Sequence, residues 1–363
     1  MTWPKRSIRL WRRTRTMPSS GDTREASSGH RPLAVIVALG VTLLVAMITG
    51  IVLGAVRIPV TEVLGAVGRM FSGGPRTLAD AVVVDIRLPR VVLAAFVGAS
   101  LAAAGALYQA LFRNPLADPY ILGISSGAGL GAMIAIVVTA GATAARFGVV
   151  PLAAFIGSGL TMLLVVRLAS TRGRLDPTSL LLAGVAVSYT LAALTAFVMV
   201  YAREQMAAIV YWMMGGLSAA SWGYVVMIVP MFLLGIAYPL LSTRELNIML
   251  LGDDRAGELG VNVERFKLGV LAAASLLTAA AVSVSGLIGF VGLMTPHIVR
   301  LILGPDHRLL LPASILGGAT LMVVADLIAR TVLAPVEIPV GIVTAVFGGP
   351  FFIWLLVRRG ARR

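Results

Sequence analysis

The chain has 363 residues, of which 58% are hydrophobic and only 13% charged, with a mean hydropathy of +0.94 and a net charge of +14. Soluble domains are close to half apolar and a quarter charged, so this composition excludes an ordinary soluble fold. The chain has no cysteine, which excludes disulfides and thiolate metal ligands.

The first 32 residues are basic, rich in Ser and Thr, and contain no apolar run, so we predict a disordered cytoplasmic tail over 1–32. Ten apolar runs follow, each close to the ~20 residues that cross the hydrocarbon core of a bilayer. They lie at about 33–56, 91–112, 120–140, 147–169, 180–201, 223–241, 266–285, 287–303, 309–330 and 338–357. They lack the alternation of barrel strands, which predicts an all-α membrane protein with about ten transmembrane helices. The helices form one membrane domain, 33–357, and a basic C-terminus follows at 358–363.

The distribution of basic residues predicts the orientation of this bundle. Of the 30 Lys and Arg residues, 22 lie in the two ends and the even-numbered connections, and eight in the odd-numbered ones. Lys and Arg accumulate on the cytoplasmic side of membrane proteins, so we expect both termini in the cytoplasm. Membrane topology and anionic lipid then explain the positive charge, and we expect no nucleic-acid partner.

Two polar segments flank the second run. "RLPR" at 87–90 precedes it on the outer side, where the charge rule disfavours arginine. "YQALFRNPLADPYILG" at 108–123 follows it on the cytoplasmic side, and Pro115 and Pro119 predict a tight re-entry there.

The most polar internal segment, Arg244–Arg265, has eight charged residues and lies on the cytoplasmic side of the predicted topology. Gly252 and Gly260 are typical C-caps and predict two short helices that are separated at Gly252. An apolar stripe follows them, made of Leu246, Met249, Leu250, Ala256 and Leu259. Such a stripe suits docking into a groove of another protein, although a solvated loop with incidental amphipathicity is also consistent with it.

No ATP site is expected in this chain. The only lysines are Lys5 and Lys267, and neither follows the glycine pattern of a phosphate-binding loop. If transport uses ATP, the ATPase is a separate subunit, and the Arg244–Arg265 segment is the natural place for it to dock.

Two C-terminal features complete the chain. Gly286, Gly289 and Gly292 recur every three residues, a spacing that allows close helix contact. Asp326 and Arg330 are four residues apart near the outer end of the ninth run, where they can pair, and Glu337 lies at the outer mouth.

Seven segments, in this order, resemble the iron-siderophore and cobalamin permease family of ABC importers. They are "RLPR", "GALYQALFRNPLADPYILGISSGAG", "LLLAGVAVS", "YWMMGGL", "LNIMLLGDDRAGELGVN", "SGLIGFVGLMTPHIVRLILGPDHRLLLPAS" and "EIPVGIVTAVFGGPFFIWLL". Together they extend over about 85–357, nearly the whole membrane domain.

The resemblance implies a permease in a bacterial cytoplasmic membrane. Its partners would be a second permease subunit (a second copy or a paralogue), two cytoplasmic ATPases, an extracytoplasmic substrate-binding protein and the lipid bilayer. No cofactor is expected in the chain, since ATP would be bound by the partner. A ferric siderophore is the expected cargo, with cobalamin and haem as alternatives.

The resemblance also implies roles for named residues. The coupling residues toward the ATPase are Leu246, Leu250, Gly252, Ala256, Leu259 and Gly260. The cytoplasmic gate falls at Asn114, Leu116, Pro177 and Thr178. Arg87, Arg90 and Arg330 would dock the binding protein.

Two other classes of protein compete with the permease interpretation. A secondary transporter or channel usually buries ionisable groups at mid-membrane, and here Asp326, with Arg330 as its partner, comes closest. A membrane-embedded enzyme needs clustered carboxylates or a metal site, but Asp253 and Asp254 lie in a loop without a nearby nucleophile or histidine.

Overall fold

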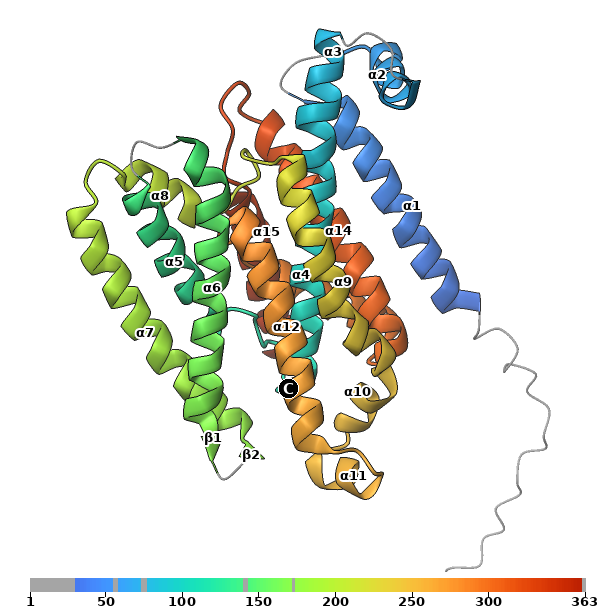
Figure 1. Cartoon of the computed structure of the whole chain (residues 1–363). Helices are drawn as coiled ribbons and strands as arrows, with labels where there is room; N and C mark the ends of the chain where they lie inside the picture. Colours follow the sequence, from blue (N-terminus) through green and yellow to red (C-terminus); the bar gives the residue numbers. More distant parts are fainter. Residues whose placement is uncertain (1–29, 55–57, 73–76, 140–142, 172–173, 361–363) are drawn as a thin grey trace, which may run out of the picture.

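The computed structural model describes residues 30–54, 58–72, 77–139, 143–171 and 174–360, and within them the chain is a bundle of long helices (Figure 1). Nearly all of the predicted tail, 1–32, lies outside the described residues, as do 361–363 of the predicted C-terminal segment.

Each of the ten apolar runs corresponds to a helix of the described chain. These are α1 (His30–Val52), α4 (Leu88–Leu111), α5 (Ile124–Val138), α6 (Thr143–Ala169), α7 (Pro177–Tyr201), α9 (Trp222–Leu241), α12 (Val263–Ser285), α13 (Val291–Leu303), α14 (His307–Thr331) and α15 (Val340–Gly360). Seven are long and apolar enough to cross a membrane, whereas α5, α13 and α15 are shorter apolar helices. Two of these are short because residues 120–123 and 287–290, inside the predicted runs, form turns instead of helix.

The remaining elements lie at the two ends of the bundle (Figure 1). One end carries α2 (Val60–Ser72), α3 (Leu78–Asp80), the π-helix η2 (Ala81–Arg87) and α8 (Met206–Met213). The other end carries α10 (Thr243–Met249), α11 (Asp253–Glu258) and a hairpin of β1 (Ser170–Thr171) with β2 (Arg174–Leu175). Apart from this hairpin, the described secondary structure is helical, which confirms the predicted all-α class.

The "RLPR" segment lies inside a helix rather than before one. Helix α3, η2 and α4 follow one another without a break from Leu78 to Leu111. In η2 the backbone hydrogen bonds join residues that are five apart, as from the Leu88 N–H to the Val83 carbonyl. Pro89 comes directly after Leu88, the C-cap of this π-helix. Proline cannot continue a regular α-helical ladder, and a π turn is a known way to accommodate such an interruption.

Helices α4 and α12 form the centre of the bundle and are buried along most of their lengths, whereas α1 and α7 lie at opposite edges and are mostly exposed (Figure 1). Glycine pairs bring α4 against its neighbours. A Cβ atom on Gly105 would lie 1.7 Å from the Gly292 carbonyl oxygen of α13, and one on Gly98 would lie 2.1 Å from the Gly318 oxygen of α14. Small residues allow such backbone contact between membrane helices.

The predicted three-residue glycine face is only partly present. Gly286 and Gly289 lie in the turn before α13, so only Gly292 of the three is on a helix. The left-handed backbone of Gly286 (φ 69°) ends α12 there.

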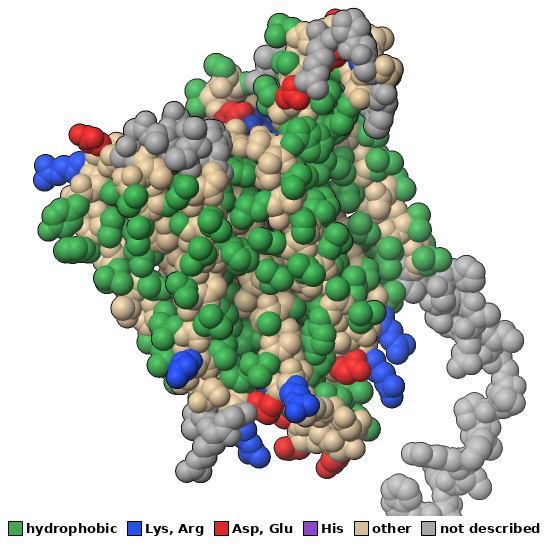
Figure 2. All heavy atoms as spheres, viewed as in Figure 1, with side chains coloured by type: hydrophobic (Ala, Val, Ile, Leu, Met, Phe, Trp, Pro, Cys, Tyr) green, Lys and Arg blue, Asp and Glu red, His purple; other side chains and the backbone are tan. Residues whose placement is uncertain are grey.

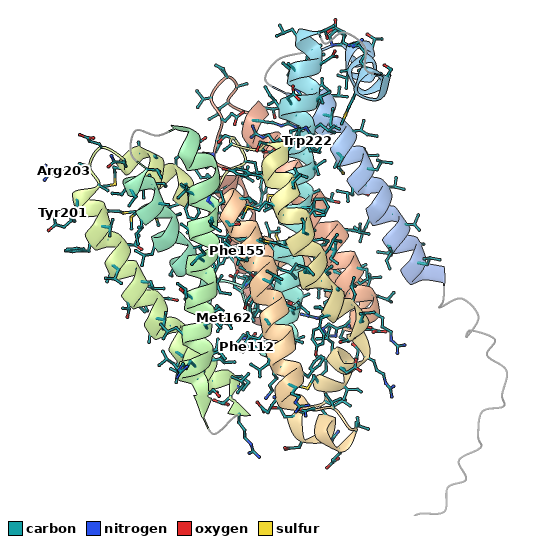
Figure 3. All side chains as sticks on the ribbon, in the orientation of Figure 1. Phe112, Phe155, Met162, Tyr201, Arg203 and Trp222 are labelled. Carbon is teal, nitrogen blue, oxygen red and sulfur yellow. The ribbon has the colours of Figure 1, made fainter. Side chains whose placement is uncertain are left out.

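The surface of the bundle matches a membrane environment. Figure 2 shows hydrophobic side chains over the middle of the visible face and charged side chains at its two ends. At the end that carries α8, the Trp222 indole N–H donates to the Val84 carbonyl at 2.9 Å and so ties α9 to η2 (Figure 3). The chain is an all-α, multi-pass membrane protein.

Candidate functional site

Two short helices, α10 and α11, lie side by side at one end of the bundle, as the sequence predicted (Figure 1). Gly252 separates them with φ 106°, a backbone conformation that only glycine adopts readily. Gly260 ends α11 with φ 85°, the Val261 N–H donates to the Ala256 carbonyl, and the Gly260 N–H donates to the Gly257 carbonyl. This pair of bonds is the Schellman ending that the C-cap glycine predicted.

The apolar stripe of these helices divides between two surfaces. Leu246, Met249 and Ala256 are buried and belong to the main core cluster of the chain. The bundle itself therefore covers Leu246 and Ala256, and their role in coupling to an ATPase stays a prediction. Leu250 and Leu259 are 40% and 60% exposed, so their side chains remain accessible to a partner protein.

Leu251 is 55% exposed and extends the available surface, although the sequence analysis did not select it. It precedes Gly252 directly, outside both helices, so helical periodicity gave no indication of it. We call Leu250, Leu251 and Leu259 the exposed leucine patch.

Helix α10 is joined to the start of α14 by Asn247. Its side-chain N–H donates to Asp306 Oδ1 at 2.6 Å, and its Oδ1 accepts the His307 backbone N–H at 2.8 Å. Asp306 caps α14, and the backbone N–H of Arg308, together with the Asn247 amide, holds the pKa of the Asp306 carboxyl below its ordinary value. Asn247 thus links α10 directly to the N-terminal end of α14.

Helix α11 is joined to the bundle by a charged cluster centred on Asp253. Its carboxylate lies 2.5 Å from Lys267 Nζ and 3.2 Å from an Arg113 guanidinium nitrogen. No sequence pattern indicated this cluster in advance, although Lys267 is the only lysine of the membrane domain. In the part of the chain that the structure describes, no group of three or more His, Cys, Asp and Glu side chains is arranged to hold a metal ion.

The first predicted gate segment is a turn between α4 and α5. The Leu116 backbone N–H donates to Asn114 Oδ1 at 2.9 Å, which fixes the turn locally, and both side chains are exposed. This arrangement agrees with the re-entry that the two prolines predicted.

The second predicted gate segment is the start of α7. Pro177 is the first helical residue and Asp176 is the N-cap, whose carboxylate accepts the Ser179 N–H at 2.8 Å. Thr178 is exposed in this first turn. Two residues near the gate segments contact the charged cluster around Asp253 and Lys267: Arg113 directly precedes Asn114, and Leu175 lies two residues before Pro177.

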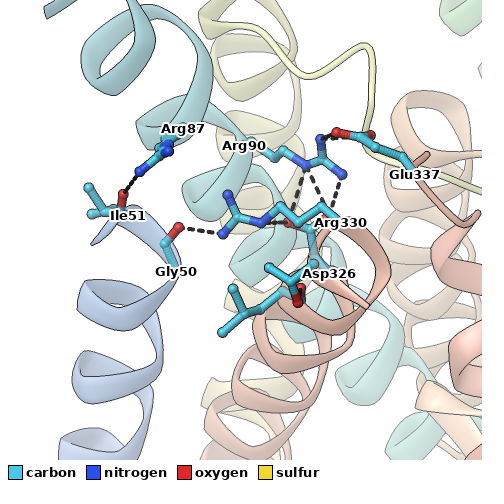
Figure 4. Close-up of polar contacts among 9 residues, drawn as sticks. Gly50, Ile51, Arg87, Arg90, Asp326, Arg330 and Glu337 are labelled. Atoms are coloured by element: carbon cyan, nitrogen blue, oxygen red, sulfur yellow. Dashed lines mark hydrogen bonds and ion pairs between the residues drawn. The ribbon is translucent and has the colours of Figure 1, made fainter. Parts of the chain in front are cut away.

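The three arginines predicted to dock a binding protein are buried in the described chain (Figure 4). Arg87 donates to the carbonyl oxygens of Ile51 at 3.0 Å and Val52 at 2.8 Å, and Arg330 donates to that of Gly50. These carbonyls belong to the end of α1, where unpaired carbonyl groups attract cations.

Arg90 forms the centre of this outer network. It lies 2.9 Å from an oxygen of Asp326 and 2.9 Å from an oxygen of Glu337. The predicted pair of Asp326 and Arg330 is present at 3.5 Å, and Glu337 binds Arg90. Internal carboxylates and carbonyls bind these three arginines, and their role in docking a binding protein stays a prediction.

A multi-pass helical bundle with paired short helices at one end is typical of a membrane permease that works with cytoplasmic partners. The model of the FecCD transport family matches residues 42–358, and the chain belongs to this family.

Several characterised relatives are similar over most of their length. The cobalamin import system permease protein BtuC of Halobacterium salinarum is 47% identical over 80% of this chain and 77% of its own. The hemin transport system permease protein HmuU of Yersinia pestis is 44% identical, covering 77% and 84%, and the Fe(3+) dicitrate transport system permease protein FecD of Escherichia coli is 42% identical, covering 76% and 85%. A solved inward-facing structure described as a metal-chelate type ABC transporter matches with a TM-score of 0.77 and 29% identity, over 90% of this chain and 99% of that one.

Proposed function

We propose that this chain is the transmembrane permease subunit of an ABC importer that carries a metal chelate inward, and that the chelate is a ferric siderophore. The observation that carries the proposal is the match to the FecCD transport family over residues 42–358. The named relatives act on cobalamin, hemin and Fe(3+) dicitrate, all of which are metal chelates. A bulky chelate is also consistent with a bundle whose helices carry few charges.

The proposed energy source is a pair of separate ATPase subunits. The sequence has no phosphate-binding loop, and the exposed leucine patch, which follows the C-terminal ends of α10 and α11, offers an apolar surface beside charged residues. Such a surface suits a hydrophobic groove. This end of the bundle is then cytoplasmic, in a bacterial inner membrane, and Asn114, Leu116, Pro177 and Thr178 at the same end form the gate.

The proposed pathway lies between two permease subunits. Helix α7 presents exposed apolar side chains, among them Leu182, Tyr189 and Phe197, toward the outside of this chain. A second copy or a paralogue placed there would complete a pathway lined by α7 and α15. An extracytoplasmic binding protein would deliver the chelate at the opposite end.

The test is transport by the purified complex in proteoliposomes, together with its ATPase and binding protein. We expect uptake of a radiolabelled ferric siderophore that requires both ATP and the binding protein. Uptake of cobalamin or hemin, without uptake of the siderophore, would contradict the siderophore assignment but would still support an ABC importer. Uptake driven by a proton or sodium gradient without ATP would instead favour a secondary transporter.

A further inference from the structure

We infer that Asp253 is a positioning residue that ties α11 to both segments of the cytoplasmic gate, so that ATPase-driven movement of α11 reaches the two segments together. The inference rests on the proposed function, and it names a contact that transmits the movement. We call Asp253, Arg113, Lys267, Glu264 and Leu175 the Asp253 cluster.

The first arm of the cluster reaches the gate turn after α4. Asp253 Oδ1 lies 3.2 Å from Arg113 Nη2, and Arg113 directly precedes Asn114. The Arg113 backbone has φ 47°, a left-handed conformation that is unfavourable for residues other than glycine. The ion pair and the two backbone bonds around it, from Arg113 N–H to the Ala110 carbonyl and from Asn114 N–H to the Gln109 carbonyl, hold this turn.

The second arm reaches the segment before α7 through Lys267. Asp253 Oδ2 lies 2.5 Å from Lys267 Nζ, and the same ammonium donates to the Leu175 carbonyl at 3.2 Å. The Leu175 N–H donates in turn to Glu264 at 2.7 Å. Both backbone groups of Leu175 are therefore held by the first turns of α12, two residues before Pro177.

The charges of the cluster make Asp253 the critical member. The Lys267 side chain is only 4% exposed, and a buried ammonium needs a close counterion. Glu264 is at 3.7 Å, so the short contact with Asp253 is the stronger of the two. When α11 moves, the two ion pairs of Asp253 can persist only if Arg113 and Lys267 move with it.

Asp254 provides a matched control. It adjoins Asp253 in the first turn of α11, is exposed, and lines the same 490 Å³ cavity. Asp253→Asn and Asp254→Asn remove the same charge from the same helix end, so they share any effect on the helix dipole. They differ in the two ion pairs with Arg113 and Lys267, which, in the part of the chain that the structure describes, Asp253 makes and Asp254 does not.

The experiment measures ATP hydrolysed and siderophore transported by the complete complex in proteoliposomes. For Asp253→Asn we expect the ATPase to stay bound and hydrolysis to remain near the wild-type rate, while siderophore transported per ATP falls by about tenfold, within the usual range of coupling between sites. Asp254→Asn should stay within about twofold of wild type, as exposed substitutions generally do.

Three further variants separate this role from a purely structural one. Asp253→Asn combined with Lys267→Met removes the buried cation together with its counterion, so no unpaired charge is left to destabilise the fold. The contact with Arg113 is still broken, and we expect the same loss of coupling. Arg113→Gln should uncouple partially, and Arg113→Gln added to Asp253→Asn should have no further effect, because both break one contact.

The inference is overturned if Asp253→Asn transports with the wild-type ratio, if it loses the ATPase on co-purification, or if Asp254→Asn is equally impaired. The wild-type arm separates this inference from the proposed function. A wild-type complex without ATP-driven uptake overturns the proposed function and this inference with it, whereas normal wild-type uptake beside a normal Asp253→Asn variant overturns the inference alone.

Discussion

Arg90 shows how the outer arginines act at the scale of single residues. Its side chain is 8% exposed and shared between two carboxylates, on Asp326 of α14 and on Glu337 before α15. A buried ion pair adds little stability compared with apolar residues of the same shape, but removal of one partner leaves an uncompensated charge. The network therefore fixes which helices meet at this end, and its loss should lower the free energy of unfolding.

Asp326→Asn tests this network. We expect it to lower the free energy of unfolding by about 3–5 kcal/mol, because Arg90 and Arg330 would lose the carboxylate that they share. The measurement is reversible unfolding in detergent micelles. Glu258→Gln makes the same chemical change at an exposed site of α11 and should stay within about 0.5 kcal/mol of wild type. Equal losses in the two variants would mean that the Arg90 network does not stabilise the fold.

At the scale of elements, α10 and α11 each have one face in the bundle and one outside it. Leu246 and Ala256 fill the inner face, and the exposed leucine patch follows the C-terminal ends of the two helices. Asn247 joins α10 to α14, and Asp253 joins α11 to α12 and to the gate turn. The two short helices thus lead to different parts of the bundle, so one docking event at the patch can move both.

Leu259→Glu tests the docking surface. We expect the variant to insert and fold normally, since the side chain is 60% exposed, but to lose co-purification with the ATPase because a carboxylate would be buried without a partner. The matched control is Leu78→Glu, an exposed leucine at the opposite end of the bundle. Wild-type amounts of bound ATPase with Leu259→Glu would remove Leu259 from the interface.

At the scale of the whole molecule, backbone contacts between glycines set the distance of α4 from α13 and α14. Gly105 and Gly129 are both buried glycines inside helices, on α4 and α5, but their surroundings differ. A Cβ on Gly105 would meet the Gly292 backbone, whereas nothing lies within 4 Å of one on Gly129.

Gly105→Ala should therefore destabilise the bundle by about 1–3 kcal/mol or more, since overpacking forces the backbones apart. Gly129→Ala should be neutral or slightly stabilising, because alanine favours helix over glycine by roughly 0.5–1 kcal/mol. Thermal unfolding of the two purified variants compares them directly. If Gly105→Ala were as stable as Gly129→Ala, the close packing of α4 would not be what holds the bundle.

The sequence was a good guide to features that one segment determines by itself. The apolar runs predicted the helices because their length follows hydrocarbon thickness, and Gly252 and Gly260 predicted the ends of α10 and α11 because their backbone favours glycine. It could not predict which side of the apolar stripe faces inward, since the core and a partner both select apolar residues. It also gave no indication of the partners of Arg90, since Asp326 and Glu337 come from more than 230 residues away in the chain.

The burial of Lys267 also gives the molecule a chemical reporter of its own movement. Amine-directed acylating reagents react with free, accessible amines, and this one is held by a carboxylate and a carbonyl. Its acylation should be slow while α11 rests against α12 and fast whenever that contact opens. The only other lysine is Lys5, so the two modified peptides are told apart by mass. Acylation of Lys267, followed during turnover, would time the opening of α11 in the unaltered protein without any introduced label.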